Sequence, residues 1–356
     1  MTDHFRKPRL LQMMLSTQQG GAETFFEKLA LAFADFGIPQ CLVIEPDVER
    51  EALFADYSNV EVVPIRFGGL TEWSARARLK RAFGGFSPDV ALTWMNRASR
   101  RVPRGYCPVV GRLGGYYGLK YYRNCDYLIG ITTDLVGHIR GNGWPESRSR
   151  LIPNFGEAAA TVGDPAAARR RIRAELEVSA DATLLLALGR LHEVKAHNVL
   201  IEALGRLKGA ELMIAGEGPL EAELRALAER LHISERVHFL GWRRDIGDLF
   251  AACDLSVFPS RYEPNGTVVM ESWAHGKPLV AARSKGPEWL IDDGENGLLF
   301  PIDDVTACAT AIQRLIDDTE LAERLVEGGR IKWQRSFSRE AIVRQYLELF
   351  EQLRVK

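Results

Sequence analysis

Residues 259–278 read PSRYEPNGTVVMESWAHGKP, and their order of residue types indicates how the whole chain is built. A short apolar run at residues 255–258 comes directly before them and predicts a buried strand. Three residues typical of turns follow the strand: Pro264, Asn265 and Gly266. From about Thr267 the pattern is that of a helix, which ends near Gly276. A strand, a glycine-bearing loop and a helix in this order present free backbone N–H groups and the positive end of a helix dipole to an anion.

Two carboxylates frame this anion site. Glu263 lies in the loop and Glu271 lies inside the helix, with seven residues between them. A carboxylate that touched a phosphate would repel it, so we expect both side chains to accept hydrogen bonds from hydroxyl groups on either side of the anion. A ligand that carries hydroxyls, then phosphate, then hydroxyls is a nucleotide sugar. An ordinary strand–helix unit with two solvated carboxylates is the alternative.

The two glutamates and their flanks resemble the Glu-x7-Glu motif of the retaining glycosyltransferases of family four. That resemblance implies a GT-B fold, an α/β architecture of two Rossmann-like doubly wound domains facing across a cleft. It also implies that Glu263 binds the hydroxyls of the donor sugar and that Glu271 binds the ribose. The distal phosphate would be bound by three backbone amides: those of Gly266, Thr267 and Val268. Asn265 stands where relatives often carry an apolar residue, which bears on the choice of sugar.

A second motif follows the apolar strand predicted at residues 183–188. Residues 189–196, GRLHEVKA, resemble the element of the same family in which an arginine and a lysine clamp the donor diphosphate. Arg190 and Lys195 occupy those positions, and with Glu263 they form the predicted catalytic set. Fixed cations stabilise the charge that develops on a leaving diphosphate without a metal ion. No Asp-x-Asp occurs in the chain, so we predict no metal site and no cofactor.

Three further glycine-containing or basic loops resemble parts of the donor site in this family. Gly216 lies in the turn AGEGP at residues 215–219, and Arg243 lies in the loop FLGWRRDI at residues 239–246, where relatives contact the base. Near the N-terminus, Gly20 and Gly21 resemble the Gly-Gly-Ala-Glu turn that faces the donor phosphates. A tight turn with glycines needed for packing is the alternative at that position.

Length and composition limit the class of protein. With 356 residues the chain is long enough for two domains, and 46% hydrophobic residues with a net charge of −1 describe a soluble globular protein that does not bind nucleic acid. The first 160 residues contain 20 Lys and Arg against 16 Asp and Glu, and the rest contain 26 against 31. The five scattered cysteines are typical of reduced thiols, and no apolar run predicts a signal peptide or a membrane span. We therefore expect a cytoplasmic protein.

The order of predicted elements sets the expected domains. Strands and helices alternate through the first half, which is typical of a doubly wound sheet with ligands at the carboxyl ends of its strands. We expect an acceptor-binding domain at residues 1–160 and a nucleotide-sugar-binding domain at residues 161–338. The last helix, residues 339–356, is expected to cross back to the first domain, as in the family that the chain resembles.

The acceptor is expected in the first domain. Residues 90–126 lack the histidine that many members of the family carry near the reacting sugar. Residues 112–120 resemble a segment of bacterial transferases that build lipopolysaccharide cores, so Arg112 and Lys120 either pair with an anionic glycolipid or are solvated surface cations. Residues 73–83, from Trp73 to Phe83, predict a basic amphipathic helix. It either lies on the anionic inner face of a membrane or packs Trp73 inward as an ordinary outer helix.

Together these patterns predict a retaining glycosyltransferase. The predicted donor is a sugar linked to UDP or GDP rather than ADP, and the predicted acceptor is a glycolipid such as a growing lipopolysaccharide core. Two alternatives remain open. The chain is a transferase or phosphorylase that acts on a small soluble sugar or metabolite, or it is a protein that only binds a nucleotide sugar.

Overall fold

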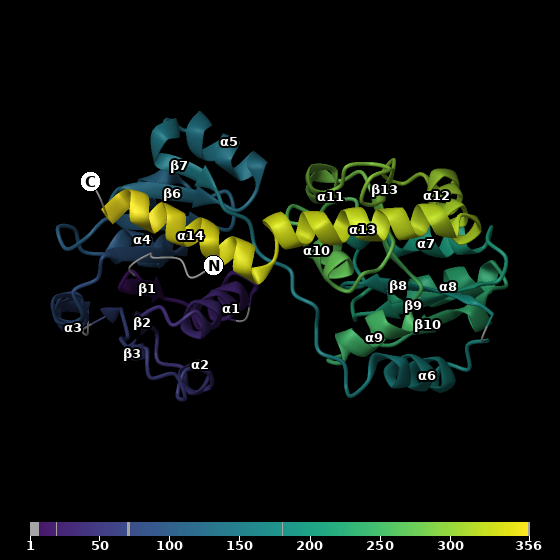
Figure 1. The fold of residues 1–356 in the computed structure, drawn as a ribbon, viewed down its shortest axis with the longest axis horizontal. Coiled ribbons are helices and arrows are strands. Elements are labelled where there is room, and N and C mark those ends of the chain that lie inside the picture. The colour runs from purple at the N-terminus through teal and green to yellow at the C-terminus, as the bar shows by residue number, and fades with distance from the viewer. Residues whose placement is uncertain (1–6, 19, 70–71, 180, 355–356) are drawn as a thin grey trace. The chain divides into compact units, whose positions relative to one another are not determined.

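The computed structural model describes residues 7–18, 20–69, 72–179 and 181–354 (Figure 1). The chain forms two compact units, and the second extends from Phe155 to Ser338. The first contains the residues before Phe155 together with the last helix, α14 (Arg339–Arg354). The first segment of this unit therefore ends at Asn154, before the boundary expected after residue 160. The Asn154 side chain accepts a hydrogen bond from Arg112 of the first unit, whereas the Gly156 N–H donates to the Phe337 carbonyl of the second, at 3.1 Å.

The first unit is a parallel sheet of seven strands in the order β3-β2-β1-β4-β5-β6-β7. Its strands are β1 (Leu10–Met14), β2 (Gln40–Ile44), β3 (Val60–Pro64), β4 (Val90–Trp94), β5 (Val109–Leu113), β6 (Tyr127–Gly130) and β7 (Ser149–Leu151). The helices before α14 are α1 (Gly21–Asp35), α2 (Val48–Ala52), α3 (Glu72–Phe86), α4 (Met95–Arg101) and α5 (Thr133–Gly141). Because β1 lies between β2 and β4, the chain reverses its direction of winding there, as in a doubly wound domain.

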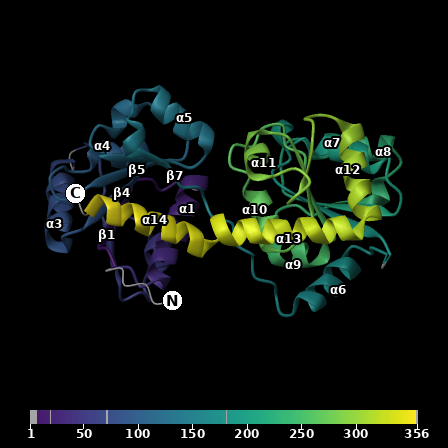
Figure 2. The same cartoon turned by 45° about the horizontal axis from the view of Figure 1, so that its top comes forward.

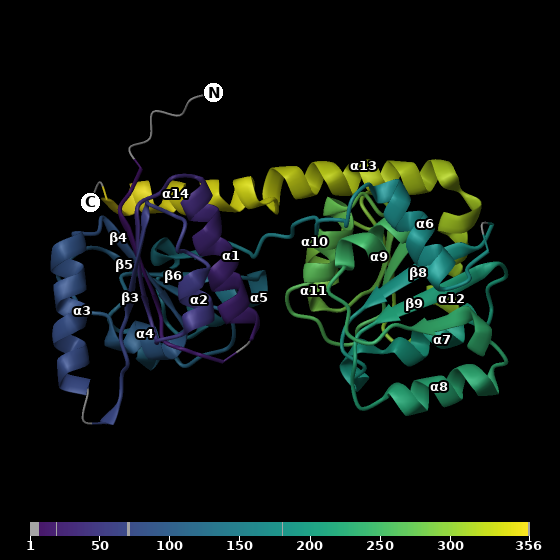
Figure 3. The same ribbon diagram turned by 90° about the horizontal axis from the view of Figure 1, so that it is seen from below.

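Helices cover both faces of this sheet. Figure 3 shows α3 and α1 on opposite sides of it. One face packs against the apolar stripe of α3, in which Ala75, Leu79 and Phe83 recur at every fourth residue and are buried. The other face packs against α1 and α14, where the ring centroids of Phe33 and Tyr346 lie 5.7 Å apart. The final helix thus completes the core of the first unit.

Arg112 is buried under this final helix, and both expectations for it are wrong. It is only 2% exposed, so it is neither a surface cation nor free to meet a ligand in solution. Its Nε donates to the Tyr346 hydroxyl at 2.9 Å, and its guanidinium lies 4.6 Å from the Phe25 ring centroid and 4.5 Å from that of Trp94. Burial lowers the pKa of this guanidinium. Arg112 is therefore a structural link between β5 and α14.

The second unit is a parallel sheet of six strands in the order β10-β9-β8-β11-β12-β13. Its strands are β8 (Thr183–Leu188), β9 (Ala210–Ala215), β10 (Val237–Phe239), β11 (Leu255–Phe258), β12 (Leu279–Ala282) and β13 (Leu298–Phe300). Its helices are α6 (Pro165–Glu175), α7 (His197–Leu204), α8 (Glu221–Arg230), α9 (Ile246–Ala252), α10 (Thr267–Ala274), α11 (Lys285–Leu290), α12 (Val305–Asp317) and α13 (Thr319–Ser336). Helices α7, α8 and α12 cover one face, and α6, α9 and α10 cover the other, with α13 alongside α10 (Figures 2 and 3).

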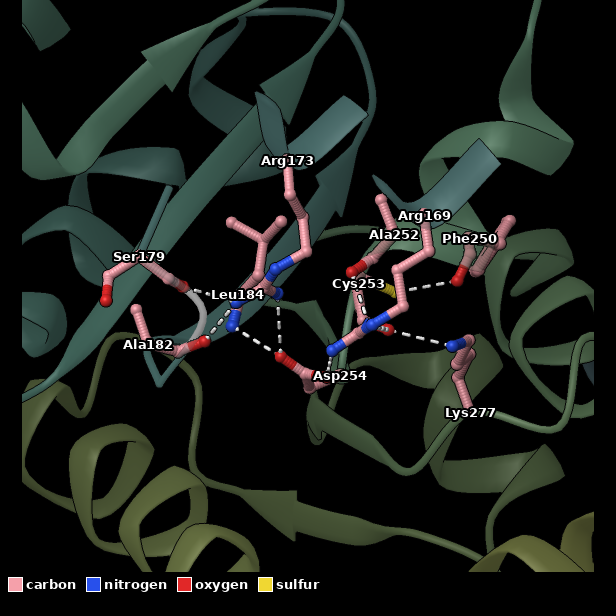
Figure 4. Close-up of polar contacts among 10 residues, drawn as sticks. All are labelled: Arg169, Arg173, Ser179, Ala182, Leu184, Phe250, Ala252, Cys253, Asp254 and Lys277. Carbon is pink, nitrogen blue, oxygen red and sulfur yellow. Dashed lines mark hydrogen bonds and ion pairs between the residues drawn. The ribbon is translucent and has the colours of Figure 1, made fainter. Parts of the chain in front are cut away.

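The Arg-rich helix α6 is fixed to this sheet by one carboxylate (Figure 4). Asp254, just before β11, accepts Arg169 Nη2 at 2.6 Å and Arg173 Nη1 at 3.2 Å. The same carboxylate accepts the Leu184 N–H of β8 at 2.8 Å. The two arginines lie one helical turn apart on α6, so their charges have a structural partner at the amino ends of the strands. In the described part of the chain, no helix is long and apolar enough to cross a membrane.

Candidate active site

Residues 255–274 fold as the strand β11, a loop and the helix α10. Gly266 precedes α10 with φ +64°, and a Cβ at this position would lie 2.6 Å from Leu290 Cδ1. Only glycine combines that left-handed backbone with that space. Among the residues that the structure describes, no side chain caps this helix, so the N–H groups of Thr267 and Val268 at its first turn have no side-chain acceptor there. The Gly266 N–H does not fit its predicted contact with a phosphate, because it donates to Glu263 Oε1 at 3.1 Å. The amides of Thr267 and Val268 remain in the uncapped first turn.

Glu263 is held through both carboxylate oxygens. Its Oε1 accepts the backbone N–H groups of Asn265 at 3.2 Å and of Gly266 at 3.1 Å, and its Oε2 accepts Lys195 Nζ at 2.7 Å. The Lys195 and Glu263 side chains are 20% and 15% exposed, so this ion pair is partly shielded from water. The structure therefore brings two of the three predicted catalytic residues together, one from each of two neighbouring strand ends.

Arg261 fixes the geometry of these two loops, and the sequence reasoning assigned it no role. Its backbone N–H donates to the Val194 carbonyl at 2.9 Å. Its side chain pairs with Asp303 at 2.6 Å and donates to Asn198 Oδ1 at 3.2 Å. The loop that carries Lys195 is thus joined to the loop that carries Glu263. Only its position two residues before Glu263 could have drawn attention to it.

Arg190, Gly216, Arg243 and Glu271 line one pocket of about 1030 Å³. They come from the loops after β8, β9 and β10 and from α10, at the edge where ligands bind in sheets of this type. The Arg190 side chain is exposed, and Glu271 is half-buried. A Cβ on Gly216 would lie 2.1 Å from the Gly189 carbonyl oxygen, so the close approach of the β8 and β9 loops requires glycine.

The guanidinium of Arg243 is already paired inside the protein. It binds Asp245 through two hydrogen bonds, of 2.8 and 2.7 Å, and Glu175 at 2.7 Å. The hydrogen bonds that Arg243 donates to Asp245, followed by the one that it donates to Glu175, raise the pKa of Arg243. Its neighbour Trp242 lines the same pocket with 73% of its surface exposed. Trp242 therefore offers a flat aromatic face beside Arg243, a feature that the sequence reasoning did not single out.

His197 contacts the loop that follows β8. Its Nε2 lies 3.3 Å from the Gly189 carbonyl oxygen, and burial lowers its pKa to about 4. The imidazole is therefore neutral at physiological pH, as expected for a buried side chain whose role is to hold the loop in place. His275 is similar, since burial and then Lys277 lower its pKa to about 4, and its Nε2 accepts the Ala159 N–H at 2.9 Å.

In the first unit, Gly20 and Gly21 open α1 as predicted. A Cβ on Gly20 would lie 2.9 Å from Glu23 Oε2, and the buried Glu23 accepts the Ser16 hydroxyl at 2.6 Å. A pocket of about 340 Å³ lies at this strand end, lined in part by Ser16 and Asn96. Asn96 Oδ1 is buried there and has no hydrogen-bond partner among the described residues. This pocket therefore has a polar atom that could bind a hydroxyl group.

Comparisons with known proteins agree with this architecture. The family "Glycosyl transferases group 1" matches residues 168–332. The lipopolysaccharide core biosynthesis glycosyltransferase LpsE of Rhizobium meliloti (strain 1021) is 36% identical over 343 residues, which cover 93% of this chain and 96% of LpsE. LpsD of the same organism, with the same description, is 33% identical over 94% of this chain and 95% of LpsD.

Solved structures share the fold at lower identity. Anabaena Alr3699/HepE in complex with UDP has a TM-score of 0.80 and 22% identity over 97% of this chain and 100% of that one. WaaG, a glycosyltransferase involved in lipopolysaccharide biosynthesis, has a TM-score of 0.64 and 17% identity over 96% of this chain and 99% of that one. The two doubly wound units and the 36% identity to LpsE over nearly the full length of both chains together show that this chain belongs to the group 1 glycosyltransferases and has the GT-B fold.

Proposed function

We propose that the protein transfers a sugar from a nucleotide-diphosphate donor to a glycolipid of the lipopolysaccharide core, with retention at the anomeric carbon. The observation that carries this proposal is the Lys195–Glu263 ion pair beside the uncapped N-terminus of α10. This arrangement combines cations and N–H groups for a diphosphate with an oriented carboxylate for sugar hydroxyls. The acceptor class rests on the description of the relatives LpsE and LpsD, which match this chain over nearly its full length.

Different residues of the second unit would bind different parts of the donor. Arg190, Lys195 and the first N–H groups of α10 would bind the diphosphate, and Glu271 would bind the ribose. Glu263 would bind the sugar hydroxyls. In the reaction the bond between the anomeric carbon and the diphosphate oxygen breaks, and the acceptor oxygen takes its place on that carbon. The acceptor's hydroxyl proton leaves with the diphosphate. The site's cations stabilise the departing charge, which lowers the barrier without a metal ion.

A donor screen tests the proposal. The purified protein is incubated with UDP-, GDP- and ADP-linked sugars and a lipopolysaccharide-core acceptor, and NMR of the product gives the anomeric configuration. We expect transfer from a UDP- or GDP-sugar with retention. EDTA should leave turnover nearly unchanged, because the protein's own cations neutralise the diphosphate. Inversion at the anomeric carbon, or activity that EDTA abolishes and Mg²⁺ or Mn²⁺ restores, would contradict the corresponding part of the proposal.

The location of the acceptor also bears on where the first unit works. A glycolipid acceptor is held in a membrane, so the first unit should work at the inner face of a membrane, on the cytoplasmic side. Helix α3 supports this part, since Trp73 is 85% exposed and does not pack inward. Exposed aromatic rings beside cations are typical of surfaces that contact anionic lipid.

A further inference from the structure

A second pocket lies in the first unit, between α3 and the C-terminal end of α4, and its volume is about 630 Å³. Five cationic side chains line it: Arg76 and Lys80 from α3, Arg100 and Arg101 from α4, and Arg104 from the segment that follows. The exposed ring of Trp73 lines the same pocket. We refer to this surface as the α3–α4 groove.

The geometry of α3 explains why only some of its cations reach the groove. Ala75, Leu79 and Phe83 face the core, and the residues at spacings of three, four and seven from Trp73 share its face of the helix. Those residues are Arg76, Ala77 and Lys80, which all line the groove. Two other cations of the predicted basic helix, Arg78 and Arg81, do not line it. Arg78 instead donates to the Pro64 carbonyl at 2.8 Å.

Positive charge in the groove exceeds the negative charge that balances it. Glu72 lies 3.4 Å from the Nε atoms of both Arg76 and Arg101, so one carboxylate serves two guanidinium groups. The Arg101 Nε is buried and makes no hydrogen bond to this carboxylate. Within the described ranges neither Lys80 nor Arg100 forms an ion pair. Cations gathered this closely repel one another, and an anion that entered the groove would relieve that repulsion.

We infer that the α3–α4 groove binds a phosphate group carried on an amphiphilic molecule. Arginine forks match the geometry of phosphate oxygens, and four arginines with a lysine at one pocket can satisfy several of those oxygens at once. Trp73 lines the same pocket, and tryptophan rings favour the membrane interface between lipid headgroups and acyl chains. The inference deepens the proposed membrane contact and rests on it only for the source of the phosphate.

Helix α3 supplies matched variants for the test. Arg76→Gln/Lys80→Gln removes two charges from the groove, and Arg78→Gln/Arg81→Gln removes two charges from the same helix outside it. Both variants are titrated with vesicles of phosphatidylcholine that contain phosphatidic acid, at low salt and at high salt. We expect the groove variant to bind about tenfold more weakly than the wild type, and the control variant to stay within about threefold of it. Circular dichroism and thermal unfolding check that both variants fold.

The comparison of the two variants distinguishes binding in the groove from general attraction by surface charge. Equal weakening in the two variants would indicate unspecific attraction by surface charge and would overturn the groove as a site. Unchanged binding in both would also overturn it. Inorganic phosphate is titrated in parallel: if it binds the wild type and displaces the vesicles, the ligand is a free phosphate, and if only vesicles bind, it is a lipid headgroup. Nucleotide binding is measured on the same samples, so that a failure of the proposed donor chemistry is seen separately.

Discussion

Gly266 shows how a single position determines both stability and the site. Its left-handed backbone turns the chain into α10, and Leu290 fills the space where a side chain would be. Gly276, just after the same helix, has nearly the same backbone, φ +62° against +64°, but its Cβ would meet only Val326 Cγ1 at 3.9 Å. The two glycines therefore form a natural comparison of backbone strain with and without a steric clash.

Replacing each of them by alanine should separate these effects. Gly276→Ala should lower the free energy of unfolding by about 1–2 kcal/mol, because alanine is strained in the left-handed region, and should leave nucleotide affinity unchanged. Gly266→Ala should lower it further and should also weaken nucleotide binding, because Leu290 must move and the first turn of α10 shifts. Denaturant unfolding and titration with the preferred nucleotide measure both effects. Identical losses in the two variants would rule out this explanation of Gly266.

His197 and His275 make the stability of the second unit dependent on pH. Burial lowers the pKa of each to about 4, below the ordinary value of 6.5. Between pH 6.5 and 4 the unfolded chain takes up protons that the folded chain does not. The part of the unfolding free energy that these two histidines contribute is therefore fully present above pH 6.5 and is lost as the pH falls towards 4, by at most about 1.4 kcal/mol per pH unit for each histidine.

A variant can test this dependence. His197→Leu removes one titrating group, so the gap in unfolding free energy between wild type and variant should narrow as the pH falls from 7 to 4.5. Urea unfolding at several pH values measures that gap. A gap that stays constant over this range would mean that His197 does not titrate as its burial implies.

At the level of elements, Arg112 of β5 holds α14 in place through a hydrogen bond to the Tyr346 hydroxyl. Arg112→Ala would leave the Tyr346 hydroxyl and the Asn154 amide oxygen without their donor, and would open a cavity between the rings of Phe25 and Trp94. We expect a loss of about 3 kcal/mol or more in unfolding free energy. Lys120, eight residues later and exposed, is the control, and Lys120→Ala should change it by less than about 0.5 kcal/mol. Similar losses in both variants would contradict the structural role of Arg112.

Elements with a strong local pattern could be predicted from the sequence. The strand at residues 255–258 and the helix from Thr267 agree with β11 and α10, because an apolar run, turn residues and a helical pattern follow one another there. The short helix α4 was not predicted, since MNRASRR has no apolar stripe and its residues read as loop. That omission also hid the α3–α4 groove, which requires the end of α4.

Contacts between distant residues could not be predicted in the same way. Nothing in the segment around Arg112 indicates that a helix more than two hundred residues later buries it. The pairing of Arg243 with Glu175 likewise depends on how α6 packs, although its partner Asp245 is only two residues away. Arg243 was predicted to contact a ligand because it is a charged residue in a loop, but in the structure its guanidinium forms ion pairs within the protein. The Lys195–Glu263 pair is of the same kind, because each residue was predicted separately and only the fold joins them.

At the level of the whole molecule, the last helix of the chain, α14, completes the core of the first unit. The buried face of α14 supplies core side chains to a sheet formed from the first residues: Ala341, Ile342, Val343, Tyr346, Leu349 and Phe350. A chain that ends at Ser338 should therefore lose amide protection in the first unit and keep it in the second, whose strands and helices are all present. Hydrogen exchange with mass spectrometry measures this by segment. Unchanged protection in β1 and β4 would show that the first unit does not need α14.

Two carboxylates of this transferase, Glu263 and Glu271, should bind different parts of the donor. Glu271, if it binds the ribose, holds the free nucleotide diphosphate as well as the donor, so its loss removes uniform binding. Glu263, if it binds the sugar, contacts nothing in the free nucleotide, and its removal leaves Lys195 available to the diphosphate. Loss of Glu263 should therefore lower turnover through poor orientation of the sugar.

Calorimetric titration of Glu263→Ala and Glu271→Ala with the nucleotide diphosphate tests this division directly. Glu271→Ala should bind it about tenfold more weakly or worse, since a hydrogen bond to a charged group contributes about 1.5–3 kcal/mol. Glu263→Ala should bind it within about threefold of the wild type, while its turnover falls. Equal losses of nucleotide affinity in both variants, no loss in Glu271→Ala, or full activity in Glu263→Ala would contradict the account.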